Sequence, residues 1–249
     1  MHNTTAMRPA TPEDLELFSS LRDRRLPDGL FIGDGIRVVR RMLATVKVER
    51  ILCPPEWVEK IAAPAGVDVV AAPKSALSEI VGFNLHQGVM ALGHIPPMKP
   101  VSGSLLVALD GVSNNENLGA VLRSCAAFGV DGVVIGPGTV SPWNRRSVRT
   151  SMGAPLYLAT HTVENLAAFC APRVAYAAHI HGERVDFRDV DYRGDVTIVL
   201  GSEATGVSDA VLKACRKTIY IAMAPDWDCL NVAASSAVLL AEVQRQRRR

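Results

Sequence analysis

Three segments in the second half of the chain place polar side chains and glycines where an apolar run ends. In the first, residues 109–135, Asn114, Asn115 and Asn117 precede a helical pattern that also carries Arg123. Asn117 and Arg123 are less than two helical turns apart, so both can lie near one end of a single helix. An asparagine-rich helix cap followed by a solvated arginine is the alternative interpretation of this pattern.

The second segment, residues 198–208, is an apolar run that leads into a loop rich in small residues. Glu203 lies there between Gly201 and Gly206, and two glycines permit a tight loop lined by backbone groups. The segment lacks the lysine ending of a phosphate-binding loop and the glycine spacing of a dinucleotide fingerprint. A simple turn with a solvated glutamate remains the alternative.

The third segment, residues 219–242, is a strand pattern, a polar loop and then a helix that opens near Asn231 with small residues. The free backbone N–H groups of a first helical turn favour an anion or a carboxylate. A close-packed helix interface, with Asn231 serving only as a cap, explains the same pattern.

Within each of the three segments, a strand is predicted to end and a loop or helix to begin. Residues 104–110 and 196–201 are almost entirely apolar, as expected of parallel strands covered on both faces. Helical patterns follow at 117–129 and from about 229 to 248. Ligands of open α/β sheets bind beyond the carboxyl ends of the strands, so we expect the three segments to form one site.

The first half of the chain also alternates between helical and strand patterns, which indicates an α/β unit. A stretch rich in proline and serine then interrupts the pattern, so we predict a first domain at 1–96, a linker at 97–103 and a second domain at 104–249. The expected elements of the first half are helices at 12–25, 34–45, 54–62 and 73–81, and strands at 48–53, 67–71 and 88–95.

Composition excludes several classes of protein. The 249 residues are 48% hydrophobic and 21% charged, with a net charge of +2, which is typical of a globular protein without overall basicity. No apolar run could span a bilayer, the first residues lack the apolar core of a signal peptide, and the five cysteines contain no CxxC pair. We therefore expect a cytoplasmic protein without a membrane segment, a disulfide framework or a metal; His179 and His181 lack a third ligand and are interpreted as strand-end surface.

Taken in order, the three segments resemble the motifs of the SpoU–TrmH group of SPOUT RNA methyltransferases. The first motif corresponds to 117–120 with Arg123, the second to 200–206, and the third to 221–223 with 229–233. A further match, 151–154, lies between them, and the likeness spans about 104–245. Residues 29–43 and 86–93 are similar, more weakly, to the small α/β domain with which many of these enzymes recruit RNA. The fold of that domain resembles an RNA-binding ribosomal protein.

Four positions of the third motif depart from the group's pattern, while four polar residues of the motifs are retained. The departures are Ala222 for proline, Pro225 for glycine, and Cys229 and Ala233 for serines. The retained residues are Asn117, Arg123, Glu203 and Asn231.

The resemblance implies an α/β fold in which a SPOUT catalytic domain, with a parallel sheet and a deep C-terminal trefoil knot, follows the RNA-binding domain. It implies a homodimer that transfers a methyl group from S-adenosylmethionine to a ribose 2′-hydroxyl, in ribosomal RNA. Methylation of tRNA or of a base, and a non-catalytic RNA-binding or assembly factor, remain alternatives. The implied cofactor contacts are Leu200, Gly201, Gly206, Ile221, Met223 and Leu230.

Arg123, Asn117, Glu203 and Asn231 are the catalytic residues that the resemblance implies. A 2′-hydroxyl is a weak nucleophile that needs orientation and loss of its proton. Arginine is normally a cation without a lone pair to offer. We therefore interpret Arg123 as the group that holds the target phosphate and hydroxyl and stabilises the developing oxyanion, with Asn117 and Glu203 orienting it within one chain or across a dimer interface.

Arginines cluster in three places from which they could contact RNA phosphates. The groups are Arg37, Arg40 and Arg41; Arg145, Arg146 and Arg149; and Arg245, Arg247, Arg248 and Arg249. The first group has the i, i+3, i+4 spacing of one helix face. A solvated face is the alternative for the first and last groups, while we expect the middle group to bind RNA.

Overall fold

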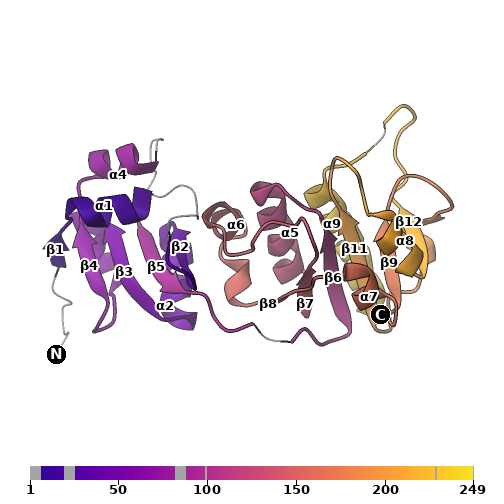
Figure 1. The fold of residues 1–249 in the computed structure, drawn as a ribbon, viewed down its shortest axis with the longest axis horizontal. Coiled ribbons are helices and arrows are strands. Elements are labelled where there is room, and N and C mark those ends of the chain that lie inside the picture. The colour runs from indigo at the N-terminus through magenta and orange to yellow at the C-terminus, as the bar shows by residue number, and fades with distance from the viewer. Residues whose placement is uncertain (1–6, 20–25, 82–87, 99, 228, 249) are drawn as a thin grey trace. The chain divides into compact units, whose positions relative to one another are not determined.

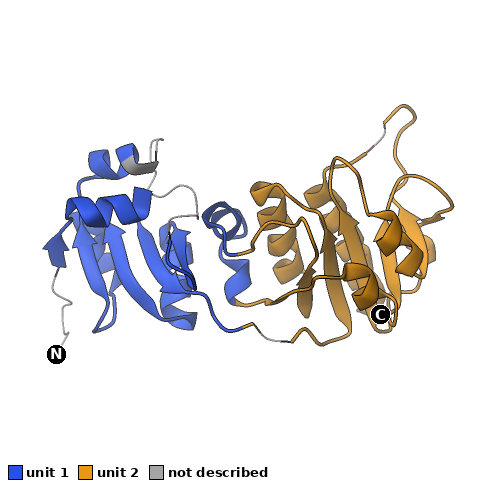
Figure 2. Ribbon diagram, viewed as in Figure 1, with its two compact units in different colours: residues 1–97, 143–156 blue, residues 98–142, 157–249 orange. Residues whose placement is uncertain are grey.

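The computed structural model describes residues 7–19, 26–81, 88–98, 100–227 and 229–248. It divides the chain into two compact units: unit 1 consists of residues 1–97 and 143–156, and unit 2 of residues 98–142 and 157–249 (Figure 2). The chain leaves unit 1 at the start of the predicted linker. The segment 143–156 nevertheless belongs to unit 1, so the second unit differs from the uninterrupted domain expected at 104–249.

Unit 1 is built on a five-stranded mixed sheet with helices on both faces (Figure 1). The strand order is β1-β4-β3-β5-β2, in which β1, β4 and β3 are parallel while β5 is antiparallel to both β3 and β2. The strands are β1 (Met7–Pro9), β2 (Leu30–Asp34), β3 (Val48–Cys53), β4 (Asp68–Ala71) and β5 (Met90–His94). The α-helices are α1 (Pro12–Ser19), α2 (Ile36–Thr45), α3 (Val58–Ile61), α4 (Lys74–Val81) and α6 (Arg145–Thr150).

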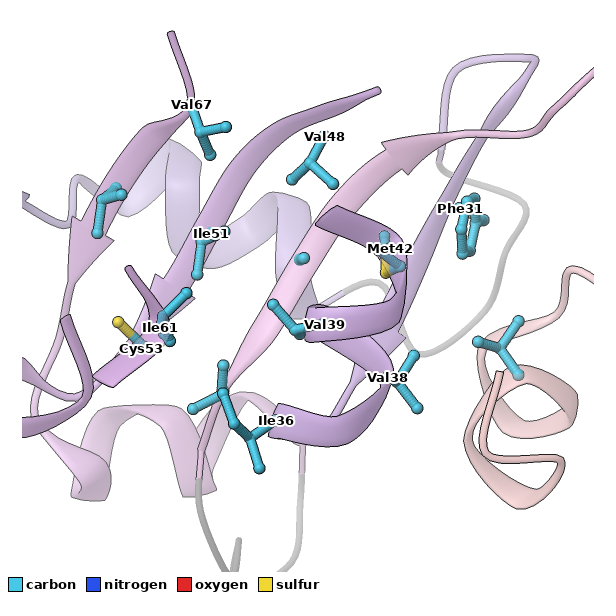
Figure 3. Packing of buried hydrophobic residues seen from close by; sticks show 14 residues of the cluster. Phe31, Ile36, Val38, Val39, Met42, Val48, Ile51, Cys53, Ile61 and Val67 are labelled. Atoms are coloured by element: carbon cyan, nitrogen blue, oxygen red, sulfur yellow. The ribbon is translucent and has the colours of Figure 1, made fainter. Parts of the chain in front are cut away.

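Alternation along the strands divides the core of unit 1 into two layers. In β3, Ile51 and Cys53 belong to the cluster that packs against α2 and α3, while Leu52 faces the cluster beneath α1 and α4. Successive strand residues point to opposite faces, so an apolar run fills both layers. Figure 3 shows the first cluster, to which Val148 of α6 also belongs.

Unit 2 is built on a seven-stranded sheet in which every neighbouring pair of strands is parallel. The order is β10-β12-β9-β11-β6-β7-β8. The strands are β6 (Leu105–Asp110), β7 (Gly132–Ile135), β8 (Ala159–Thr162), β9 (Ala175–Ala178), β10 (Val185–Asp186), β11 (Val196–Gly201) and β12 (Lys217–Tyr220). The predicted parallel α/β architecture is confirmed, with the almost wholly apolar β6 and β11 side by side at its centre.

Helices α5 (Asn115–Ala127) and α9 (Val232–Arg247) pack against each other in unit 2. Helices α7 (Leu166–Cys170) and α8 (Asp209–Ala214) also pack together, over a core formed by β6, β7, β9 and β11. None of the helices in the described ranges is long and apolar enough to cross a lipid bilayer.

The helices and strands differ from expectation mainly at short elements. The predicted helix at 12–25 ends at Ser19 in the structure, and residues 20–25 lie outside the described residues. The helix expected at 34–45 begins only at Ile36, because the residues before it form β2. Strands β1, β2, β8 and β10 were not predicted, since each has at most five residues and too short an apolar pattern to be recognised.

Candidate functional site

Three side chains from the three polar segments meet in one hydrogen-bonded cluster in unit 2. The amide nitrogen Nδ2 of Asn231 donates to Oδ1 of Asn117 at 3.0 Å and to Oε1 of Glu203 at 2.5 Å. Asn117 lies in the first turn of α5, Glu203 in the loop after β11, and Asn231 directly before α9. The predicted convergence of these segments is therefore present within this unit.

Helix capping explains why the asparagines lie there. Oδ1 of Asn114 accepts hydrogen bonds from the backbone of Glu116 and Asn117, and Oδ1 of Asn231 accepts one from Ala233. These bonds satisfy N–H groups that lack partners within their own helices. The cap interpretation and the site interpretation thus both apply to Asn231, because its oxygen caps α9 while its nitrogen joins the cluster.

Helices α5 and α9 run parallel, so both amino-terminal ends face the cluster. Asn117 bonds Asn231 at that end, and Nε2 of Gln244 donates to the Phe128 carbonyl at the other. The amino-terminal end of a helix carries a partial positive charge. The Glu203 carboxylate therefore lies where two helix dipoles stabilise a negative charge.

The loop that carries Glu203 closes tightly on itself and depends on two glycines. Ser202 and Gly206 exchange backbone hydrogen bonds of 3.1 and 2.9 Å. A Cβ at Gly201 would lie 2.1 Å from the carbonyl carbon of Gly206, and Gly206 itself has φ +70°. Neither position accommodates a side chain without strain, so the glycines hold Glu203 at the tip of a rigid turn.

A cavity of about 400 Å³ lies beside this cluster, bounded by the ends of β9, β11 and β12 and by the start of α9. Its wall combines apolar side chains such as Ile219 and Leu239 with the backbone of the loop 201–206. All six residues expected to contact a cofactor line this cavity, as do Glu203 and Asn231. The six are Leu200, Gly201, Gly206, Ile221, Met223 and Leu230.

Two histidines that the sequence analysis interpreted as strand-end surface also line the cavity. His179 and His181 follow β9 and contribute to its wall. Burial, reinforced by the neighbouring His181, lowers the pKa of His179, while Asp209 acts in the opposite direction. The rule that located the other segments, polar residues after a parallel strand, applies to this pair as well. No group of three or more metal-ligating side chains occurs in the part of the chain that the structure describes.

Arg123 lies on α5 but does not line the cavity. Its side chain is exposed and forms no hydrogen bond or ion pair with another described residue. Within one chain, Asn117 and Glu203 bind Asn231 and not this guanidinium, so its orientation by these two residues across a dimer interface stays a prediction.

Arg145 has a different role from the predicted contact with RNA. It is only 6% exposed, and its guanidinium lies 3.1 Å from the Asp34 carboxylate and 3.3 Å from the Phe18 carbonyl. These bonds attach α6 to the core of unit 1, since an arginine is buried favourably only when it is paired. The prediction for Arg145 was wrong because tertiary packing removes it from solvent.

The remaining arginines of the first two groups lie on α2 and α6, both in unit 1. Arg37, Arg40, Arg146 and Arg149 are exposed, and Arg41 is half-buried. Arg41 donates to the Met152 carbonyl in the turn after α6. The bond brings α2 close to the end of α6, so one unit presents both groups; we call Arg37, Arg40, Arg41, Arg146 and Arg149 the basic patch.

The arginines near the carboxyl end of α9 make structural contacts. Arg247 donates to the carbonyls of Tyr192, Gly194 and Ser104, and Arg245 pairs with Glu242. Arg247 therefore secures α9 to neighbouring loops of unit 2. Arg249 lies outside the described residues.

The chain is similar to known proteins along most of its length. It is 33% identical over 203 residues to a protein of Mycobacterium avium strain 104 described as an uncharacterized tRNA/rRNA methyltransferase, a match that covers 75% of this chain and 65% of that protein. The match thus spans slightly less than two thirds of this relative.

Solved structures share the fold over almost the whole chain. One described as an RNA 2′-O ribose methyltransferase has a TM-score of 0.82 at 26% identity, covering 98% of this chain and 100% of its own. The SpoU methyltransferase AviRb from Streptomyces viridochromogenes, solved with AdoMet, has a TM-score of 0.81 at 23% identity and covers 96% and 98%.

The sequence profile of the SpoU rRNA methylase family matches residues 104–241. This range is more than half of the chain and contains all three motifs and the whole cavity wall. The chain therefore belongs to the SpoU rRNA methylase family, as its motifs indicated.

Proposed function

We propose that this chain is a methyltransferase that uses S-adenosylmethionine to methylate a ribose 2′-hydroxyl in ribosomal RNA. The observation that carries the proposal is the cavity in unit 2. Three motif segments that are far apart in the sequence converge there, and the retained residues Asn117, Glu203 and Asn231 bond to one another beside it. Membership of the family supports the same reaction class.

The cavity fits a nucleoside-containing cofactor. Its volume of about 400 Å³ falls in the range of roughly 300–1,000 Å³ that is usual for small-molecule sites. Leu200, Ile219 and Leu239 provide apolar walls, and the loop 201–206 provides backbone donors and acceptors. Bound here, S-adenosylmethionine would supply an activated methyl group on its sulfonium.

The polar residues around the cavity have two roles, positioning of the helices and stabilisation of charge. Asn231, held by Asn117 and Glu203, keeps the starts of α5 and α9 together and so preserves the shape of the cavity wall. The Arg123 guanidinium, which has no partner among the described residues, can bind the target phosphate and stabilise negative charge on the 2′-oxygen. The hydroxyl proton would pass to water or to a phosphate while the methyl–sulfur bond breaks and the new carbon–oxygen bond forms.

The proposal includes a cytoplasmic homodimer and a deep trefoil knot formed by the carboxyl-terminal segments. Arg123 does not line the cavity of its own chain, so a second protomer could bring its own Arg123 to this cavity. Exposed residues of α5 and α9, among them Val238, form a surface for such a contact. Cross-linking and sedimentation would test whether the dimer forms. Methyl transfer by an Arg123→Ala protein mixed with a cavity variant would test the shared site, because active sites shared between protomers regain activity in the mixture.

RNA recruitment is assigned to unit 1 through its basic patch. Phosphate contacts release counterions, so each one adds about 0.7–0.9 to the slope of log affinity against log salt. Replacing Arg146 and Arg149 by alanine should reduce this slope by about 1.5 and weaken binding of every RNA to a similar extent. An unchanged slope would place the RNA elsewhere.

Two measurements test the whole proposal. Calorimetry with S-adenosylmethionine should show binding, whereas a non-catalytic RNA-binding or assembly factor, which the four departures in the third motif would suit, need not bind it. Mapping of 2′-O-methyl groups in RNA from cells with and without the gene should reveal one site missing from ribosomal RNA. A methyl group missing from tRNA, or from a base, would instead show that the substrate is tRNA or that the target is a base.

A further inference from the structure

The cavity wall contains a pair of histidines, of which His179 lies against the glycine loop. The rings of His179 and His181 lie edge to face with their centroids 5.6 Å apart. A Cβ on Gly206 would come within 2.7 Å of Nδ1 of His179, so this imidazole rests against the backbone of the loop. His179 is therefore packed into the wall, and the exposed His181 lies beside it.

The charged groups around this pair carry both signs. Asp209, at the start of α8, acts on His179 as a carboxylate. Glu203 lies at the tip of the loop on the same cavity. From the strand side, the Arg184 guanidinium stacks 5.0 Å above the ring of Tyr220, which also lines the cavity. Histidine is the side chain whose ordinary pKa places its change of charge between pH 5 and 8.

Burial and the second histidine keep the pKa of His179 below its ordinary value, which is near 6.5. His179 is therefore neutral at pH 8 and gains its charge only as the pH falls below that value. A sphere of the cavity's volume is about 9 Å across, comparable to the screening length of about 8–10 Å in ordinary buffers. A charge on the wall thus acts on any ligand in the cavity.

We propose that His179 and His181 form an ionisable wall that sets the charge preference of this cavity: when neutral they admit a cationic ligand, and when protonated they discriminate against it. The inference rests on the proposed function, in which the methyl donor carries a sulfonium cation. Transfer of the methyl group to the oxygen turns the sulfonium into a neutral thioether. The neutral wall consequently favours the donor over the demethylated product more than the charged wall does.

The test compares S-adenosylmethionine with S-adenosylhomocysteine by calorimetry between about pH 8 and pH 5. The two ligands share their amino, carboxyl and adenosine groups and differ in the charge at sulfur, so the ratio of their affinities cancels the other titrations. In the wild type, the ratio should shift roughly threefold to tenfold toward the thioether as the pH falls. In the double variant His179→Asn with His181→Asn, the shift should be less than about twofold.

Controls separate this effect from misfolding. His94 lies in unit 1 and makes a half-exposed pair with Glu49, so the His94→Asn variant should retain the full shift. Binding of S-adenosylhomocysteine by the double variant would show that its cavity is intact. If this binding is lost, the single variants His179→Gln and His181→Gln are measured in its place. Each of them should reduce the shift of the affinity ratio with pH.

The outcomes also distinguish the inference from the proposed function. A flat ratio in the wild type, or a full shift in the histidine variants, would overturn the ionisable wall while leaving the methyltransferase assignment in place. Absence of binding by both ligands at every pH would overturn both.

Discussion

Helices α5 and α6 each begin at an asparagine cap, but Arg123 of α5 and Arg145 of α6 lie in opposite environments. On α5, Arg123 is exposed and has no partner among the described residues. On α6, Arg145 is buried in unit 1 and paired with Asp34. An arginine is thus available to a ligand at position 123, whereas at position 145 it is a buried, ion-paired residue that stabilises the fold.

The difference follows from what surrounds each helix. Helix α6 packs against β2, and its Val148 belongs to the apolar cluster of unit 1. An arginine directed into such a core requires a carboxylate, because an unpaired buried charge is strongly unfavourable. At Arg123, the face of α5 is exposed to solvent. Arginine clusters therefore indicate function only where the fold leaves them exposed.

The largest expected effect is the loss of the buried pair. Substitution of Arg145→Met leaves the Asp34 carboxylate buried without a partner, which costs about 3–5 kcal/mol. Urea unfolding should show this loss in the free energy of unfolding. Arg146→Met, at the adjacent exposed position, should change it by less than about 0.5 kcal/mol.

A second variant examines the cause. Combining Arg145→Met with Asp34→Leu removes both charges, and most of the lost stability should return. If the single variant Arg145→Met were as stable as the wild type, the ion pair between Arg145 and Asp34 would not stabilise the packing of α6.

The next effect concerns Arg123 and should appear in the rate alone. Arg123→Ala should lower methyl transfer roughly 10²- to 10³-fold, as expected when a group that stabilises an oxyanion is lost. Its melting temperature should stay near that of the wild type, because the side chain is exposed and has no hydrogen bond or ion pair with a described residue. Radiolabelled methyl transfer and thermal denaturation measure the two quantities.

Arg123→Lys refines this prediction. Lysine retains the charge but lacks the planar fork that binds phosphate in two places, so turnover should remain well below that of the wild type. Near-normal turnover would mean that a point charge suffices.

A smaller effect on stability is expected at the start of α9, where α5 is joined to it. Asn231→Ala removes a helix cap and two bonds of the cluster, for a loss of about 1–2 kcal/mol. Asn165→Ala removes only a cap, from α7, and serves as the matched control. Both are measured by urea unfolding, and an equal loss in the two variants would show that the cluster adds no stability.

The smallest effect is expected at Cys229, which is exposed and lines the cavity. A thiol is a weak hydrogen-bond donor, so Cys229→Ser should change turnover and cofactor affinity by less than about twofold. Complete loss of methyl transfer would show that the thiol has a function of its own.

Much of the fold was predictable because its signals are local. The apolar runs of β6 and β11 and the helical patterns of α5 and α9 each express one element's own periodicity. Strands β1, β8 and β10 were not predictable, since each is short and is defined by its pairing with a neighbour. The convergence of the motif loops was predictable as well, because parallel strands end at one edge of their sheet.

By itself, the sequence determined the longer helices and strands, the three motifs and the six residues expected to contact the cofactor. Only the tertiary structure decided that α6 joins unit 1, that Arg145 is buried, that Asn231 bonds both Asn117 and Glu203, and that His179 lies on the cavity wall. The physical reason is that element types depend on neighbours along the chain, whereas the environment of a charge depends on residues that only folding brings near.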